Sequence, residues 1–200
     1  MNAVAAPLHL VGCGILHKEV NYLIGQNGWN LVPLFLDSAL HNYYDRLQGQ
    51  LTHSLDDAEQ QARQTVVFYG ACHPKMADML EEHHTVRTHG QNCIVMLLGY
   101  ERFMEELRKG ACFLLEDWAL SWEPMLTEAF GRNQSVVREI FHSSHQYLLA
   151  VRTPCSDDFT LAAESAARFV DLPLVWMDAD LKHLEWVLTE ALDRKRRTLQ

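Results

Sequence analysis

Apolar residues are distributed along the chain in two different patterns. Seven short segments are mostly apolar or extended in character, at residues 7–13, 30–37, 65–70, 85–90, 111–117, 146–153 and 172–180. Short apolar runs of this kind, bounded by Gly, Pro and Asp, predict strands that are covered on both faces. Between these runs, apolar residues recur three and four positions apart, which predicts helices.

The predicted helices alternate with the strands along the chain and cover residues 15–28, 40–64, 74–84, 92–110 (helical at least from Glu101), 118–131, 135–144, 156–171 and 181–197. Pro124 predicts a kink or break in its helix, and Ser156 is a candidate N-cap. Strands separated by helices of this length form βαβ units. We therefore predict an α/β fold, doubly wound, with a mostly parallel sheet and helices on both faces. Without a linker or repeat, residues 1–200 are expected to form a single domain.

The charge of the chain limits the partners that it can have. It contains 17 Lys and Arg against 26 Asp and Glu, a formal net charge of -9. This excess of acid argues against nucleic acid or an anionic membrane as the main partner, because either would require clustered basic residues. The sequence also lacks a membrane-spanning apolar run and the basic start of a signal peptide. We expect a cytoplasmic protein whose five cysteines stay reduced.

Cysteine and histidine are concentrated where predicted strands end. In open parallel sheets, ligands bind beyond the carboxyl ends of the strands. The ends of the first four predicted strands, together with the residues just after them, supply three cysteines and a histidine. With their polar neighbours, these residues are Cys13, His41, Asn42, Tyr69, Cys72 and Cys93. Because parallel strands end at one edge of a sheet, we expect these side chains to face a common site.

Three thiolates and an imidazole suit a borderline or soft metal. A Cys3His set is a familiar zinc environment, and three cysteines with an open position suit an iron–sulfur cluster. We predict Cys13, Cys72 and Cys93 as ligands and His41 as the fourth ligand or a pocket base, and the open position favours the cluster over zinc. Asn42 and Tyr69 would orient a small-molecule substrate by hydrogen bonds. An enzyme with this site would be a metal-dependent lyase or transferase, although the sequence does not establish catalysis.

A second interpretation needs no metal. Free cysteine is among the most buried residue types, so each thiol can also act as a small apolar side chain. The protein would then be an accessory or small-ligand-binding module with reduced, unligated thiols. Cys112 is expected to be a core residue, and Cys155 lies at a possible helix start, where a thiol pKa is lowered. His83 and His84 end a predicted helix and are expected on the surface.

Several short motifs occur in a characteristic order. "VGCG" follows the first strand, "LHN" the second and "YGAC" the third, and "NCIVMLLG" and "FLLEDW" come later. From about Leu8 to Trp186 the chain resembles a bacterial and archaeal family described as a domain of unknown function, DUF1638. The resemblance implies a pocket built from Cys13, His41, Asn42, Cys72 and Cys93. It also implies an association with corrinoid-dependent methyltransferase systems, and so a corrinoid or methyltransferase protein as partner.

The sequence departs from the family pattern in two places. The glycine-rich turn expected after the central cysteine is replaced by "CHPKM". Tyr43 and Tyr44 stand where a proline is expected after "LHN". Both changes affect the size of the implied pocket and its substrate, and leave the three cysteines in place.

Overall fold

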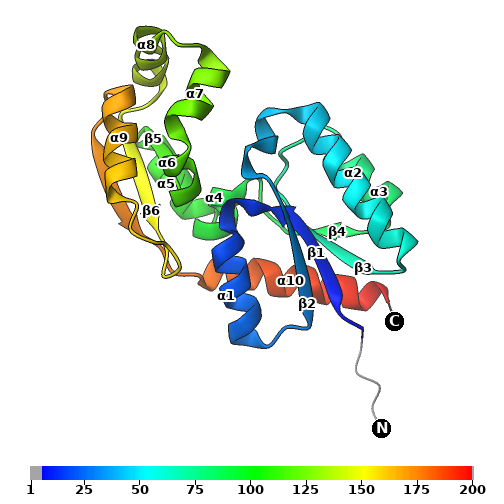
Figure 1. The fold of residues 1–200 in the computed structure, drawn as a ribbon. Coiled ribbons are helices and arrows are strands. Elements are labelled where there is room, and N and C mark those ends of the chain that lie inside the picture. The colour runs from blue at the N-terminus through cyan, green and yellow to red at the C-terminus, as the bar shows by residue number, and fades with distance from the viewer. Residues whose placement is uncertain (1–5, 200) are drawn as a thin grey trace. The chain divides into compact units, whose positions relative to one another are not determined.

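The computed structural model describes residues 6–199. Contacts between Cα atoms group the chain into two compact units, Met1–Leu97 with Lys182–Gln200, and Leu98–Leu181. Each unit contains one parallel sheet with helices around it (Figure 1). The predicted α/β fold with parallel strands is thus confirmed, with the strands divided between two sheets. Compact units need not fold independently, so the single domain expected over residues 1–200 stays a prediction.

The sheet of the first unit has four parallel strands in the order β2-β1-β3-β4. Their bounds are β1 Leu8–Cys13, β2 Leu31–Leu36, β3 Gln64–Phe68 and β4 Val86–Arg87. Helices α2 (Tyr44–Gln60) and α3 (Met76–Glu82) lie on one face, and α1 (His17–Asn27) and α10 (Lys182–Thr198) lie on the other (Figure 1). This is the doubly wound arrangement that the sequence predicts.

The core of this unit explains why its strands read as apolar runs. Successive side chains of a strand point to opposite faces, and in β1 both Leu10 and Val11 are buried. Val11 packs in one cluster with the α2 residues Leu47, Leu51 and Leu55. These leucines recur every four residues and form a stripe along the helix. With helices on both faces, an alternating polar pattern in β1 would bury polar groups.

The strand order creates a crevice at one position of the carboxyl edge. From β1 the chain goes outward to β2 and then crosses β1 to form β3 on its other side. Such a reversal of direction separates the connections that follow the two strands and opens a ligand site between them. Cys13 ends β1, and Cys72 follows β3 by four residues. The topology therefore places two of the predicted metal ligands at the switch point.

The second unit has three parallel strands in the order β5-β6-β7, with bounds β5 Ala111–Leu114, β6 Tyr147–Arg152 and β7 Leu174–Asp178. Its helices are α5 Tyr100–Arg108, α6 Glu116–Leu120, α7 Trp122–Phe130, α8 Gln134–Ser144 and α9 Thr160–Val170. A separate apolar cluster fills the unit, and Trp122, Phe141 and Phe159 are its large aromatic members. Each unit thus has a core of its own.

Three predicted helical segments, 40–64, 92–110 and 118–131, are divided in the structure. Residues 40–64 begin with a short 3-10 helix, η2 (Ser38–Asn42), before α2 starts at Tyr44. Residues 92–110 form α4 (Cys93–Leu98) and α5, which are separated by Gly99 at a φ of 81°. A left-handed φ of this kind favours glycine and interrupts a helix. None of the described helices is both long and apolar enough to cross a membrane.

Pro124 and Ser156 do not have the roles in their helices that the sequence predicts. Pro124 does not break its helix; the break is at Ser121, and Pro124 lies in the first turn of α7, where its missing N–H costs little. Ser156 does not cap α9, which begins at Thr160. Its hydroxyl instead accepts a hydrogen bond from the backbone of Thr153 at 3.0 Å, in the turn after β6.

We predict that Leu51→Ala lowers the free energy of unfolding of the first unit by about 2–5 kcal/mol, because it leaves a cavity between α2 and the sheet. Leu161→Ala is the matched control: the same change at a side chain that is 80% exposed should alter stability by no more than about 0.5 kcal/mol. Urea denaturation followed by circular dichroism measures both. Equal effects of the two variants would contradict the assigned core.

Candidate functional site

The predicted site residues all lie at the carboxyl edge of the first sheet. Cys13 is the last residue of β1, and Tyr69 directly follows β3, three residues before Cys72. Cys93 is the first residue of α4, after β4. His41 and Asn42 end η2, which follows β2. Each of the four strand exits thus contributes to this edge.

Two glycines hold the exit of β1 between its neighbours. A Cβ added to Gly12 would lie 2.7 Å from the Cβ of Phe68 on β3. One added to Gly14 would lie 2.9 Å from the carbonyl oxygen of Leu36 on β2. Both contacts are shorter than real Cβ contacts, so the backbone on each side of Cys13 requires glycine. The "GCG" sequence therefore fixes Cys13 close to both adjacent strands.

The loops that bear Cys72 and Cys93 touch through their backbones. The N–H of Ala71 donates a hydrogen bond to the carbonyl of Gln91 at 2.8 Å. A Cβ on Gly70 would lie 2.5 Å from the same carbonyl oxygen and 2.7 Å from the Cα of Asn92. Asn92 in turn starts α4, because its side chain accepts a hydrogen bond from the N–H of Val95 at 2.9 Å. This chain of contacts sets the position of Cys93 relative to Cys72.

Cys13 and Cys72 both lie within electrostatic range of Cys93. Burial raises the pKa of Cys93 far above its usual range, and Cys13 and Cys72 raise it further, against hydrogen bonds with the backbones of Ile94 and Cys93 itself. Burial also raises the pKa of Cys72, while a hydrogen bond with the backbone of Gly70 and the charge of Arg87 oppose it. Both shifts favour the protonated thiol.

Tyr69 places an unsatisfied hydroxyl beside two of these thiols. The residue is 1% exposed, and its hydroxyl has no hydrogen-bond partner in the part of the chain that the structure describes. Burial raises the pKa of Tyr69 well above its usual range, and Cys13, Cys72 and Asp37 raise it further. An unpaired buried hydroxyl costs about 1–3 kcal/mol. A ligand or ordered water that accepts this hydrogen bond would remove the cost.

His41 has its tautomer set by the turn that carries it. Asp37 starts η2 by accepting a hydrogen bond from the N–H of Ala39 at 2.8 Å. The Nδ1 of His41 lies 2.7 Å from the carbonyl oxygen of Ser38. Because a carbonyl only accepts, Nδ1 carries the proton and the lone pair of neutral His41 is on Nε2. Nε2 is then the atom that could bind a metal or take up a proton. Asn42, the next residue, is exposed.

The predicted metal ligands do not form a tight set. Between residues 6 and 199, the one group of at least three His, Cys, Asp or Glu side chains whose ligand atoms all lie within 4.8 Å of one another is Asp56, Glu59 and His83. A tetrahedral zinc with bonds of about 2.3 Å would require sulfur atoms about 3.8 Å apart. Cysteines that bind different irons of a cluster are spaced more widely, since the cluster itself separates them. The ligand atoms of Cys13, Cys72 and Cys93 do not all lie within 4.8 Å of one another, so they do not form a preformed zinc site.

The group around His83 is a feature that the sequence analysis missed. His83 was expected on the surface but is buried, with Nδ1 3.2 Å from Glu59 Oε1 and 3.8 Å from Asp56 Oδ1. It continues the buried stripe of α3, at the spacing Met76, Met79, Leu80, His83, which is the signal that could have revealed it.

This group is a poor metal site. The Nε2 atom of His83 is buried and has no partner among the described residues. A metal on Nδ1 would force the proton onto Nε2 and leave a buried N–H without an acceptor. We interpret the group as a hydrogen-bonded pair of His83 with Glu59 that ties α3 to α2.

The two other cysteines lie in the second unit. Cys112 packs against its apolar core, as expected, and burial raises its pKa to about 12. Cys155 is not at a helix start, because α9 begins five residues later at Thr160. Its N–H donates to the Thr153 hydroxyl at 3.1 Å within the turn after β6. The activation of Cys155 by a helix N-terminus is therefore not found.

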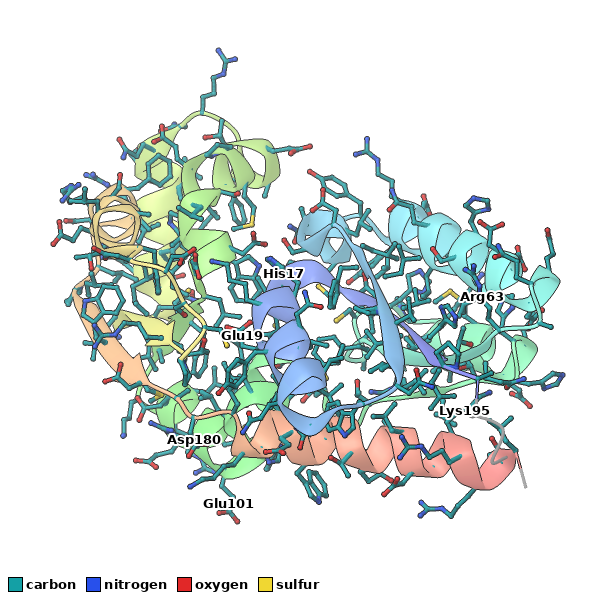
Figure 2. All side chains as sticks on the ribbon, turned by 60° about the horizontal axis from the view of Figure 1, so that its bottom comes forward. His17, Glu19, Arg63, Glu101, Asp180 and Lys195 are labelled. Carbon is teal, nitrogen blue, oxygen red and sulfur yellow. The ribbon has the colours of Figure 1, made fainter. Side chains whose placement is uncertain are left out.

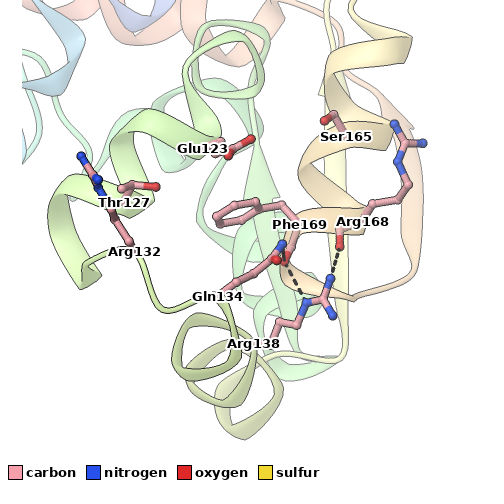
Figure 3. Close-up of a pocket in the computed structure, with 8 residues that line it drawn as sticks. All are labelled: Glu123, Thr127, Arg132, Gln134, Arg138, Ser165, Arg168 and Phe169. Carbon is pink, nitrogen blue, oxygen red and sulfur yellow. Dashed lines mark hydrogen bonds between the residues drawn. The ribbon is translucent and has the colours of Figure 1, made fainter.

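A pocket of about 620 Å³ in the second unit contains none of the predicted site residues (Figure 3). It is formed by α7, α8, α9 and the loop before α8. Arg138 donates hydrogen bonds to the carbonyls of Phe169 and Arg168, at 3.1 and 3.0 Å, and so caps the end of α9. Figure 3 shows Arg132 and Arg168 on opposite sides of the pocket. The three arginines thus do not converge on one point.

The fold and the strand-end residues define an α/β protein with thiols at the carboxyl edge of a parallel sheet. The sequence model of a family described as "Protein of unknown function (DUF1638)" matches residues 35–188. The chain therefore belongs to this family. The match includes His41, Cys72 and Cys93 and begins after β1, so that Cys13 lies outside it. No curated protein and no solved structure gives a significant match.

We predict that Gly70→Ala lowers the free energy of unfolding by about 1–3 kcal/mol, because the new methyl group meets backbone atoms that cannot rotate away. Gly49→Ala in α2 is the matched control, since its methyl group would enter open space. In a helix this exchange should be neutral or stabilising by up to about 1 kcal/mol. Chemical denaturation measures both, and a harmless Gly70→Ala would contradict the close approach of the two loops.

The raised pKa values of Cys72 and Cys93 predict slow alkylation. Only the thiolate reacts, so a higher pKa reduces the reactive fraction at a given pH and moves the rate profile to higher pH. Iodoacetamide labelling between pH 6 and 10, quantified for each cysteine by mass spectrometry, tests this. The same chain unfolded in urea supplies the reference. If the labelling rate of the folded protein rises at the same pH as in the unfolded chain, or at a lower pH, the burial of these thiols is contradicted.

Proposed function

We propose that the first unit binds a metal centre through the thiolates of Cys13, Cys72 and Cys93, with an iron–sulfur cluster favoured over zinc. His41 is the fourth ligand through Nε2 or a base in the same pocket. One observation supports the proposal: thiols at neighbouring strand exits lie at the same edge as the buried hydroxyl of Tyr69, which has no hydrogen-bond partner among the described residues. Three cysteines leave an open position most naturally in a cluster, which is why the cluster is favoured over zinc.

The electrostatics of the site support a metal as the occupant. Two of the three thiols have raised pKa values, so removing their protons is costly while nothing positive is bound. A metal cation reverses this preference, because it stabilises the thiolate and releases the proton. Binding would therefore become tighter as the pH rises. The same burial that makes the empty thiols unreactive would then keep water away from the bound group.

The remaining side chains would handle a small-molecule substrate. A metal centre with an open position supplies Lewis acidity when it is bound. The hydroxyl of Tyr69 would donate its unused hydrogen bond to the substrate, and the amide of Asn42 would orient it. His41, if it is not a ligand, would take up a proton at Nε2. These roles fit a lyase or transferase.

The cellular setting of the proposal rests on the family resemblance. It suggests a bacterial or archaeal cytoplasmic protein connected with corrinoid-dependent methyl transfer and one-carbon metabolism. The partner would be a corrinoid or methyltransferase protein. The net charge of -9 is consistent with a partner other than nucleic acid or an anionic membrane.

An accessory module without a metal is the second candidate. The observation that favours it is the lack of a tight ligand set among the three cysteines and His41 in the described chain. In that case the reduced thiols and Tyr69 would line a pocket for a small ligand.

Protein purified without oxygen should contain iron and acid-labile sulfide in matching amounts and should absorb visible light. Cys72→Ala should lose both iron and sulfide, because it removes a ligand at the centre of the site. Cys112→Ala is the matched control, since this thiol is also partly buried but lies in the other unit, and it should retain them.

If the purified protein contains zinc and no sulfide, the metal centre is a zinc site and not an iron–sulfur cluster. A protein that binds neither metal, even after anaerobic reconstitution, would contradict the proposal and favour the module with unligated thiols.

A further inference from the structure

Arg87 links the two loops that carry Cys72 and Cys93. It is the last residue of β4 and is half-buried at the carboxyl edge. Its Nη1 donates hydrogen bonds to the carbonyls of Thr88 and Gly90, both at 2.9 Å, and reaches the carbonyl of Tyr69 at 3.5 Å. One guanidinium thus connects the exit of β3 with the segment that leads to Cys93.

The charge of Arg87 is not neutralised by a carboxylate. Within residues 6–199, no acidic side chain forms an ion pair with it. Its charged neighbour from α10 is Arg194, which donates a hydrogen bond to the Arg87 carbonyl at 2.6 Å. The nearby carboxylate of Glu190 is already engaged, by Arg194 at 2.8 Å and by His89 at 3.2 Å.

An uncompensated cation in this position is unfavourable. Burial lowers the pKa of Arg87, the Cys72 thiolate raises it, and Arg194 lowers it. A partly buried charge without a counter-ion loses solvation, and hydrogen bonds to neutral carbonyls replace only part of what it loses. Because Arg87 bonds to backbone carbonyls at Tyr69 and Gly90, it lies between the loops that carry Cys72 and Cys93, and the thiolates of these loops are the groups that would balance its charge.

We propose that Arg87 is the counter-ion of the loaded thiolate site and holds its Cys72 and Cys93 loops in place. This inference rests on the proposed function. Three thiolates around a doubly charged metal group leave one net negative charge, which a single guanidinium balances. Arg87 acts through Cys72 and is a positioning residue, not a ligand.

Two substitutions separate the charge of Arg87 from its hydrogen bonds. Arg87→Lys keeps the charge and loses the planar fork, whereas Arg87→Gln keeps a donor and loses the charge. Arg63→Gln is the control: this exposed arginine of the same unit directly precedes β3 and so lies at the amino edge. Figure 2 shows Arg63 and His17, which follows β1, at opposite ends of this unit.

The experiment measures Zn²⁺ affinity without oxygen, by competition with a chromophoric chelator. Arg87→Gln should weaken binding by about tenfold to a hundredfold, the usual effect of losing a partner of a metal ligand. Arg87→Lys should restore most of the affinity, and Arg63→Gln should match the wild type. In protein reconstituted with iron and sulfide, Arg87→Gln should also shift the reduction potential to more negative values, because an electron is added less easily without the cation. Denaturation of the metal-free variants checks that each is folded.

The possible results distinguish this inference from the proposed function. Wild-type affinity in a folded Arg87→Gln variant would overturn the counter-ion while leaving the thiolate site intact. Equal losses in Arg87→Lys and Arg87→Gln would also overturn it, because hydrogen bonding alone would then explain the effect. A wild-type protein that binds neither zinc nor iron would refute the thiolate site itself, and the counter-ion with it.

Discussion

The close backbone packing of strand exits is the constraint on which the rest of the site depends. Gly12 lies against Phe68, and Gly70 lies against the backbone of Gln91 and Asn92, at distances that exclude any side chain. These backbone contacts alone, without any contribution from the thiols, hold the segments after β1, β3 and β4 together. A cysteine on each segment then faces a common region, because parallel strands end at one edge.

This packing has an electrostatic consequence. Burial raises the pKa of the Cys93 thiol, and the negative charge that Cys13 and Cys72 carry when ionised raises it further. Among the described residues, the hydroxyl of Tyr69 has no hydrogen-bond partner in the same region, and no carboxylate pairs with Arg87 there. Unsatisfied donors and an unbalanced cation are both unfavourable for a site that stays empty. A thiolate-bound metal with a hydrogen-bonding substrate would satisfy all three features.

The sequence predicts the edge on which the site lies, because continuous apolar runs identify parallel strands and their ends identify the edge. Cys13, Cys72 and Cys93 could be placed there without a structure. The division into two sheets could not be predicted, since a βαβ unit has the same pattern whichever sheet its strand joins. Arg87 was missed because it reads as a polar residue in a short extended segment, and its role depends on three carbonyls from two loops. The spacing of the sulfur atoms depends on loop conformations that residue patterns do not encode.

Differential alkylation tests most directly whether the three thiols share one metal centre. Metal-free protein and protein reconstituted with iron and sulfide are labelled in separate anaerobic samples, for long enough that the slowly reacting thiols of the metal-free protein are modified, and each of the five cysteines is quantified by mass spectrometry. The account predicts that Cys13, Cys72 and Cys93 become protected together, whereas labelling of Cys112 and Cys155 does not change. Unchanged labelling at all five positions, or protection of only one of the three, would contradict a shared site.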